Sequence, residues 1–134
     1  MEIPYVLARF RIRGLRAEVK GRALVDTGAA VTVIDESLAD HIGVEPVGST
    51  LSVRLRGICC EVEGGLVNVK YLELEGRAVG STSVIRLELS DEVKEALGRT
   101  GARDDIIIGV RDLAIGFMVN VKERKLEYIG PLAI

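Results

Sequence analysis

Apolar and polar residues alternate along much of this chain. In residues 8–13 apolar side chains alternate with arginines, and in residues 51–56 leucine and valine alternate with serine and arginine. A repeat of two residues is typical of a strand with one buried face. Similar patterns and β-branched runs predict further strands at 17–25, 31–34, 61–69 (interrupted at Gly64-Gly65), 72–75, 77–89 and 105–109, and a final hairpin over 119–129.

Three short helices are expected between these strands. Asp35 is a suitable N-cap for the first helix, which Gly43 would end, and Ser90 opens a second, which Gly98 would end. A third is expected over residues 112–117. Many short strands separated by turns indicate a mainly β barrel or sandwich. A length of 134 residues, 48% of them hydrophobic, fits a single domain spanning residues 1–134.

Composition and charge narrow the function classes. A net charge of −2 gives no basic surface for nucleic acid, and no apolar run is long enough to cross a membrane. The N-terminus lacks the features of a signal peptide, so we expect a cytoplasmic location. The absence of glutamine, with only two asparagines among many charged residues, suggests a thermophile.

Metal and cofactor chemistry finds little support. Cys59 and Cys60 are adjacent, so they cannot join distant parts of the fold, and we interpret them as small strand residues. His41, the single histidine, falls at the end of the first predicted helix and is interpreted as a solvated residue. With this set no zinc-type site can be assembled, and we expect no metal and no cofactor.

The candidate chemistry lies at the end of the second predicted strand. Three apolar residues, Ala23-Leu24-Val25, lead directly into Asp26, and Thr27, Gly28 and Ala29 follow. A carboxylate at the end of a core strand is costly to bury, which favours a functional role. Asp26-Thr27-Gly28 alone would also be compatible with an ordinary turn, but ordinary turns join polar strand ends.

This segment resembles the active-site motif of retropepsin-like aspartic peptidases, in which apolar residues flank Asp-Thr-Gly-Ala. Ile107-Ile108-Gly109 resembles the apolar-apolar-glycine element found late in that family's chains. Here Val110, rather than a charged residue, follows the glycine. The resemblance implies a closed acid-protease β-barrel with two or three short helices. It also implies a flap hairpin between the two motifs, for which Gly57, Ile58 and Cys59 are the candidates.

The resemblance further implies an aspartic endopeptidase that hydrolyses extended peptide or protein substrates. Since the chain has one Asp-Thr-Gly, the second carboxylate would come from a homodimer partner. Asp26 would be catalytic. In the same catalytic and dimer-locking loop, the Thr27 hydroxyl would hold the two subunits' loops together, Gly28 would supply a backbone donor and a close approach to substrate, and Ala29 would follow. Ile107, Ile108 and Gly109 would support the loop. Asp35 and Asp112 would lie outside the dyad. Two alternatives are a catalytically weak or inactive dimerisation or peptide-binding module, and an unrelated β-barrel with a coincidental motif.

Overall fold

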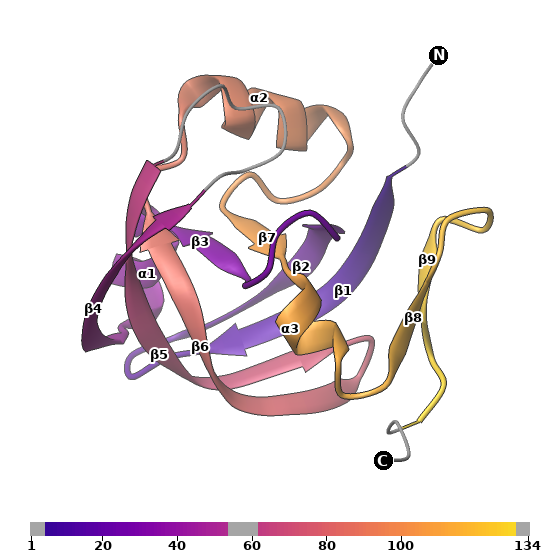
Figure 1. Cartoon of the computed structure of the whole chain (residues 1–134), viewed down its shortest axis with the longest axis horizontal. Helices are drawn as coiled ribbons and strands as arrows, with labels where there is room; N and C mark the ends of the chain where they lie inside the picture. The colour runs from indigo at the N-terminus through magenta and orange to yellow at the C-terminus, as the bar shows by residue number, and fades with distance from the viewer. Residues whose placement is uncertain (1–4, 54–61, 131–134) are drawn as a thin grey trace.

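A computed structural model of the chain describes residues 5–53 and 62–130 (Figure 1). Nine strands are found within these ranges, and seven of them form one sheet. Those seven are β1 (Val6–Arg13), β2 (Glu18–Val25), β3 (Val33–Asp35), β4 (Glu45–Val53), β5 (Val62–Leu74), β6 (Arg77–Leu87) and β7 (Ile106–Ile108). The other two, β8 (Phe117–Asn120) and β9 (Lys125–Tyr128), form a separate hairpin.

Six of the strands close into a barrel. The sheet order is β1-β2-β7-β3-β6-β5-β4, and an additional pairing of β1 with β5 joins the two sides. Most pairings are antiparallel, but β2 pairs with β7 and β3 pairs with β6 in parallel. The short β7 therefore lies between β2 and β3, where the chain segments that follow β2 and β7 emerge together.

The alternation in the first strand produces the barrel core. Val6, Ala8, Phe10 and Ile12 are buried, whereas the arginines between them point outward. The largest fully buried side chains elsewhere include Ile34, Ile42, Leu72, Leu74, Ile106 and Ile108. The prediction of a mainly β fold is confirmed, and so are the strands predicted at 8–13 and 17–25 and the final hairpin.

The three helices differ in part from their predicted bounds. α1 (Glu36–Ile42) begins after the N-cap Asp35 and ends at Gly43, as predicted. α2 (Asp91–Arg99) begins after the N-cap Ser90, but Gly98 lies inside it rather than ending it. α3 (Val110–Leu113) begins two residues earlier than predicted, and its first N–H groups are bound by the loop that follows β2. It also ends four residues earlier than predicted, because Phe117 begins β8.

The interruption predicted at Gly64-Gly65 is wrong, since β5 runs through it for 13 residues. A Cβ at position 64 would lie 2.4 Å from the Cγ2 of Ile85, so Gly64 permits close packing instead of breaking the strand. The predicted hairpin tip, including Gly57, Ile58 and Cys59, lies outside the described residues. None of the helices in the described ranges is long and apolar enough to cross a membrane.

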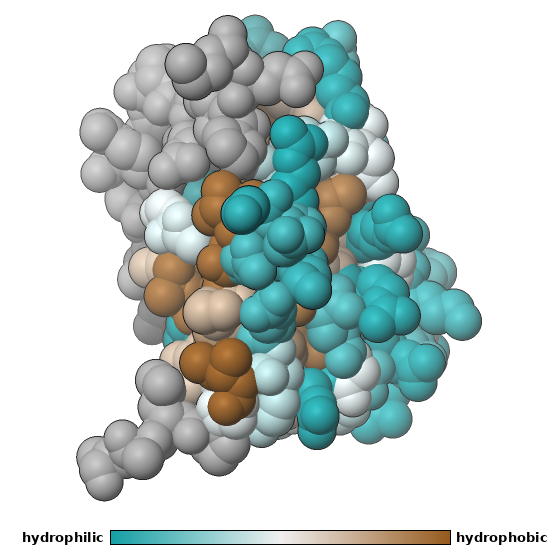
Figure 2. All heavy atoms as spheres, turned by 90° about the vertical axis from the view of Figure 1, so that its right-hand side faces the viewer, coloured by the Kyte–Doolittle hydropathy of each residue, from teal (hydrophilic) through white to brown (hydrophobic). Residues whose placement is uncertain are grey.

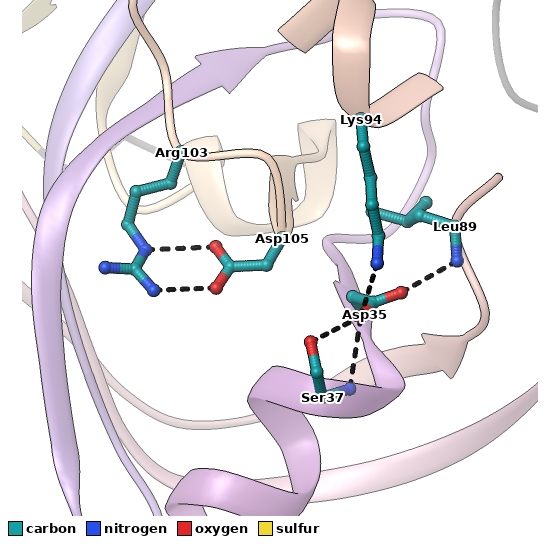
Figure 3. Close-up of polar contacts among 6 residues, drawn as sticks. All are labelled: Asp35, Ser37, Leu89, Lys94, Arg103 and Asp105. Atoms are coloured by element: carbon teal, nitrogen blue, oxygen red, sulfur yellow. Dashed lines mark hydrogen bonds and ion pairs between the residues drawn. The ribbon is translucent and has the colours of Figure 1, made fainter. Parts of the chain in front are cut away.

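Two ion pairs lie at the end of β3 and just before the start of β7 (Figure 3). The Asp35 carboxylate accepts from the backbone N–H of Leu89 at 2.8 Å and lies 3.4 Å from Lys94 Nζ on α2. Arg103 makes a two-bond contact with Asp105, at 3.0 and 2.7 Å. The Asp35 contact with Lys94 fastens α2 to the end of β3, whereas the Arg103–Asp105 pair lies within the segment before β7.

Candidate active site

Asp26 is the first residue after β2, and its backbone is tied to β7. Its N–H donates to the carbonyl of Ile108 at 2.9 Å, which extends the parallel pairing of Val25 with Ile108. The apolar run before Asp26 therefore forms a core strand, and the aspartate lies where the chain leaves the sheet. The loop that follows spans residues 26–32, and we call it the Asp26 loop.

The Asp26 side chain is largely enclosed, with 8% of the residue exposed. Its Oδ1 accepts from the N–H of Gly28 at 2.8 Å, and its carbonyl accepts from the N–H of Ala29 at 3.0 Å. Within the described part of the chain, no lysine, arginine or histidine forms an ion pair with it. Thr27 and Gly28 are exposed, whereas Ala29 is buried.

Gly109 brings the junction of β7 and α3 against the Asp26 loop. A Cβ built on Gly109 would lie 2.4 Å from the carbonyl carbon of Val31 and 2.7 Å from the backbone nitrogen of Thr32. Both atoms belong to the backbone, so a side chain at this position would have to push the loop away. Ile108 and Gly109 thus contact the loop that carries Asp26, and Ile107 pairs with Leu24 in the strand that leads into it.

The first turn of α3 is hydrogen-bonded to the same loop. The N–H of Val110 donates to the carbonyl of Ala29 at 2.9 Å, and the N–H of Arg111 donates to the carbonyl of Ala30 at 3.1 Å. The start of a helix leaves such N–H groups without partners inside the helix. Here the Asp26 loop satisfies them, so loop and helix form one unit.

Sequence analysis missed the polar cluster that joins this unit to the barrel. Asp112, which is 2% exposed, accepts from Thr32 Oγ1 at 2.5 Å and from Thr82 Oγ1 at 2.9 Å. Thr32 Oγ1 in turn accepts from the N–H of Gly109 at 3.0 Å. The sequence signal for Asp112 was its position beside apolar Leu113, three residues after Gly109, but its partners lie 80 and 30 residues away.

The candidate flap is represented only by the two strands that approach it. β4 and β5 pair antiparallel, and Val53 opposite Val62 is the last pair before the undescribed residues 54–61. Two surface hollows lie away from Asp26. Both are lined by residues of β1 and β2, including Arg9 and Arg22.

Known proteins share this arrangement of strands. The aspartyl protease family matches residues 8–111, a range that includes the Asp26 loop and Gly109. Among solved structures, the retroviral protease-like domain of Ddi1 from Leishmania major is similar with a TM-score of 0.56. That match has 16% sequence identity and covers 99% of this chain and 97% of that chain.

Two further solved structures show weaker similarity. EIAV protease complexed with the inhibitor HBY-793 has a TM-score of 0.49 at 15% identity, covering 84% of this chain and 86% of that chain. A retropepsin-like aspartic protease from Rickettsia conorii has a TM-score of 0.47 at 15% identity, covering 90% of this chain and 91% of that chain. No curated protein matches the sequence.

The likeness to the Ddi1 domain confirms the predicted closed, retropepsin-like barrel. The family match extends over most of the chain and includes both sequence motifs. It rules out the alternative of an unrelated β-barrel with a coincidental Asp-Thr-Gly. The chain belongs to the aspartyl protease family.

Proposed function

We propose that this chain is one subunit of a homodimeric aspartic endopeptidase, with a catalytic dyad formed by Asp26 and the partner subunit's Asp26. The observation that carries the proposal is the placement of Asp26. It ends a core strand, is held by the N–H of Gly28, and lies on a loop whose Thr27 and Gly28 are exposed. The family match supports the same chemistry.

The dyad would act on a water molecule held between the two carboxyl groups. Two carboxylates about 3 Å apart cannot both ionise, so they share one proton. The ionised carboxylate takes a proton from the water as the water oxygen attacks the peptide carbonyl carbon. The protonated carboxyl hydrogen-bonds the carbonyl oxygen as negative charge develops there. Protonation of the leaving nitrogen and breakage of the C–N bond then release two peptides.

Exposed apolar side chains at the start of α3 and in the segment that follows it would form part of the contact with the second subunit. Val110 follows Gly109, is 43% exposed, and has its N–H bonded to the carbonyl of Ala29. Met118 and Ile129, in and beyond the β8–β9 hairpin, are also exposed. Figure 2 shows the side of the molecule on which that hairpin lies, and apolar patches interrupt its hydrophilic surface. In the proposed dimer, the Thr27 hydroxyl would bond across the interface and hold the two loops together.

An extended peptide is the proposed substrate. The antiparallel strands β4 and β5 lead toward residues 54–61, where Gly57, Ile58 and Cys59 would form a flap over the peptide. A flap that closes over substrate excludes water and fixes the scissile bond. The second candidate function is a dimerisation or peptide-binding module that cleaves little. The buried carboxylate of Asp26, with no cationic partner in the described chain, favours the enzyme.

Asp26→Asn tests the proposal. Asparagine keeps the shape of the side chain but cannot take the proton from water, so peptide cleavage should fall by several orders of magnitude, about 10⁴-fold or more. Circular dichroism and sedimentation should show an unchanged fold and dimer. Asp104→Asn is the matched control, because Asp104 is exposed and distant in sequence from the loop. Ordinary cleavage by Asp26→Asn would refute the catalytic assignment, and a wild-type dimer that cleaves no peptide would favour the module.

A further inference from the structure

The strongest unexplained feature is the buried carboxylate of Asp112, which the proposed chemistry does not use. We propose that Asp112, acting through Thr32, is a positioning residue that fixes the Asp26 loop in its catalytic geometry. The inference deepens the proposed function and rests on it for its kinetic readout. It also makes a prediction about the loop that does not depend on activity.

Two members of the cluster are enclosed, and the third, Thr82, is half-buried. Asp112 is 2% exposed and Thr32 is 0% exposed. A carboxylate removed from water is costly unless hydrogen bonds replace its hydration. Both oxygens of Asp112 have such partners, one in Thr32 at 2.5 Å and one in Thr82 at 2.9 Å. Each partner is a hydroxyl, so both contacts are made by uncharged groups.

The direction of each hydrogen bond follows from the donors. A backbone N–H can only donate, so Thr32 Oγ1 accepts from Gly109. The hydroxyl hydrogen of Thr32 is therefore left to donate to Asp112. The result is a directed chain from Gly109 N–H through Thr32 to Asp112. A side chain at position 32 without a hydroxyl breaks both links at once.

This chain connects three parts of the molecule. Thr32 ends the Asp26 loop, Gly109 and Asp112 belong to the β7–α3 junction, and Thr82 lies on β6. The same junction holds Asp26 itself, because the N–H of Asp26 donates to Ile108 and the N–H of Val110 donates to Ala29. A shift of the junction relative to the loop would therefore move the Asp26 carboxylate.

Catalysis is sensitive to such a movement. Two carboxyl groups must share a proton and a water, and a misplacement of about 1 Å can cost about 100-fold in rate. The alternative is that the cluster only stabilises the barrel. Asp35 offers a matched comparison, because it is also 2% exposed and fully hydrogen-bonded, but its partners are Ser37, Leu89 and Lys94. Loss of Asp35 interactions should reduce stability without moving the Asp26 loop.

Two substitutions at Thr32 separate hydrogen bonding from packing. Thr32→Val keeps the shape and removes the hydroxyl, whereas Thr32→Ser keeps the hydroxyl and removes a methyl group. If the hydroxyl positions the loop, kcat falls about 10- to 100-fold in Thr32→Val and stays near the wild-type value in Thr32→Ser. If packing is what matters, Thr32→Ser is the more damaged of the two.

Asp112→Asn provides a second variant of nearly identical shape, in case Thr32→Val does not fold. Its amide has one accepting oxygen in place of two, so we expect a smaller decrease in kcat, about 3- to 10-fold. The Asp35→Asn control should keep wild-type kcat even if its melting temperature falls as far as that of Asp112→Asn. Wild-type kcat in folded Asp112→Asn would overturn the proposal, as would an equal loss of kcat in Asp35→Asn.

Amide hydrogen exchange supplies the readout that does not need cleavage. The N–H groups of Gly28 and Ala29 are both bonded to Asp26, so they report the loop directly. Exchange at these two amides should become faster in Thr32→Val and Asp112→Asn but not in Asp35→Asn. If wild-type protein cleaves no peptide, the proposed peptidase function fails, while this exchange pattern still decides the role of Asp112. Unchanged exchange in both variants would refute that role.

Discussion

At the scale of single residues, the four buried aspartates in the described part of the chain have different surroundings. Asp35 accepts hydrogen bonds from Ser37 and Leu89 and lies beside Lys94 (Figure 3). Asp112 is bound by two threonine hydroxyls. Asp26 is bound by the N–H of Gly28 at the edge of an exposed loop. Asp105 is bound by Arg103 through both of its oxygens. Asp35 and Asp112 also have both oxygens engaged in structural contacts, which favours Asp26 as the proposed catalytic carboxylate.

The surroundings of Asp35 predict a contribution to acid stability. Burial opposes ionisation of its carboxyl group, but hydrogen bonds from the Ser37 side chain, the backbone N–H groups of Leu89 and Ser37, and Lys94 outweigh burial and lower its pKa. A carboxyl with a lowered pKa in the folded state stabilises the fold above its unfolded pKa of about 3.9. That stability is lost as the pH falls through the folded value.

Asp35→Asn should therefore destabilise the protein near neutral pH, by about 1–3 kcal/mol. The difference from wild type should narrow as the pH falls below about 4, because the wild-type carboxyl is then protonated too. Urea unfolding at a series of pH values measures this directly. A difference that stays constant between pH 7 and pH 3 would show that the charge of Asp35 does not contribute.

Local sequence revealed only part of these residue environments. The role of Asp35 as an N-cap was predictable, because Ser37 lies two residues away. Its bond to Leu89 joins residues 54 positions apart, and no local pattern contains that information. The same holds for Asp112: the sequence placed it outside the dyad but did not reveal its partners. The structure shows it bonded to Thr32 at the end of the Asp26 loop.

At the scale of elements, the site depends on the contact between the Asp26 loop and the β7–α3 junction. Gly109 has an extended backbone, with φ of −98°, so conformational freedom does not explain the glycine. Lack of space explains the glycine, since a Cβ at position 109 would overlap the backbone of Val31 and Thr32. The glycine of the motif Ile107-Ile108-Gly109 therefore allows the backbone at the β7–α3 junction to approach that of the Asp26 loop closely.

Gly109→Ala should force these backbones apart. Because the neighbouring atoms belong to the main chain and cannot rotate away, we expect a loss of stability of about 2 kcal/mol or more, together with a large loss of peptide cleavage. Gly98→Ala is the matched control. Gly98 lies inside α2 with open space around its Cα, so alanine should stabilise the protein by up to about 1 kcal/mol. Thermal unfolding of both variants gives the comparison, and an unaffected Gly109→Ala would contradict the packing argument.

The same reasoning explains why some element bounds were predicted incorrectly. Gly98 and Gly64-Gly65 were interpreted as ends or interruptions, because glycine often ends helices and weakens strands. Gly98 continues the helix without a left-handed backbone, and Gly64 lies in a strand because Ile85 occupies the space of a side chain. Capping residues with their own side-chain bonds, Asp35 and Ser90, gave correct helix starts.

At the scale of the whole molecule, the barrel depends on pairings between distant segments. β1 pairs with β5 as well as with β2, and β7 lies between β2 and β3. Alternation along the chain predicted the strands, but strand order and closure came only from the family resemblance, because local patterns do not specify which strands pair. The chain carries one Asp-Thr-Gly, so the proposed dyad would require a second chain.

The proposed requirement for two chains gives the final prediction. Inactive Asp26→Asn subunits mixed with wild-type subunits, and allowed to exchange, should form mixed dimers that carry one catalytic carboxylate. Such dimers lack the shared-proton pair and should not cleave peptide. With random pairing in an equal mixture, half of the wild-type subunits enter mixed dimers. The mixture should therefore show about half of the cleavage that its wild-type subunits show when no variant is added. Asp104→Asn subunits keep Asp26, and their substituted position is exposed. Adding them should not reduce the cleavage shown by the wild-type subunits. Cleavage that stays constant as Asp26→Asn is added, despite proven subunit exchange, would mean that each chain carries a complete active site of its own.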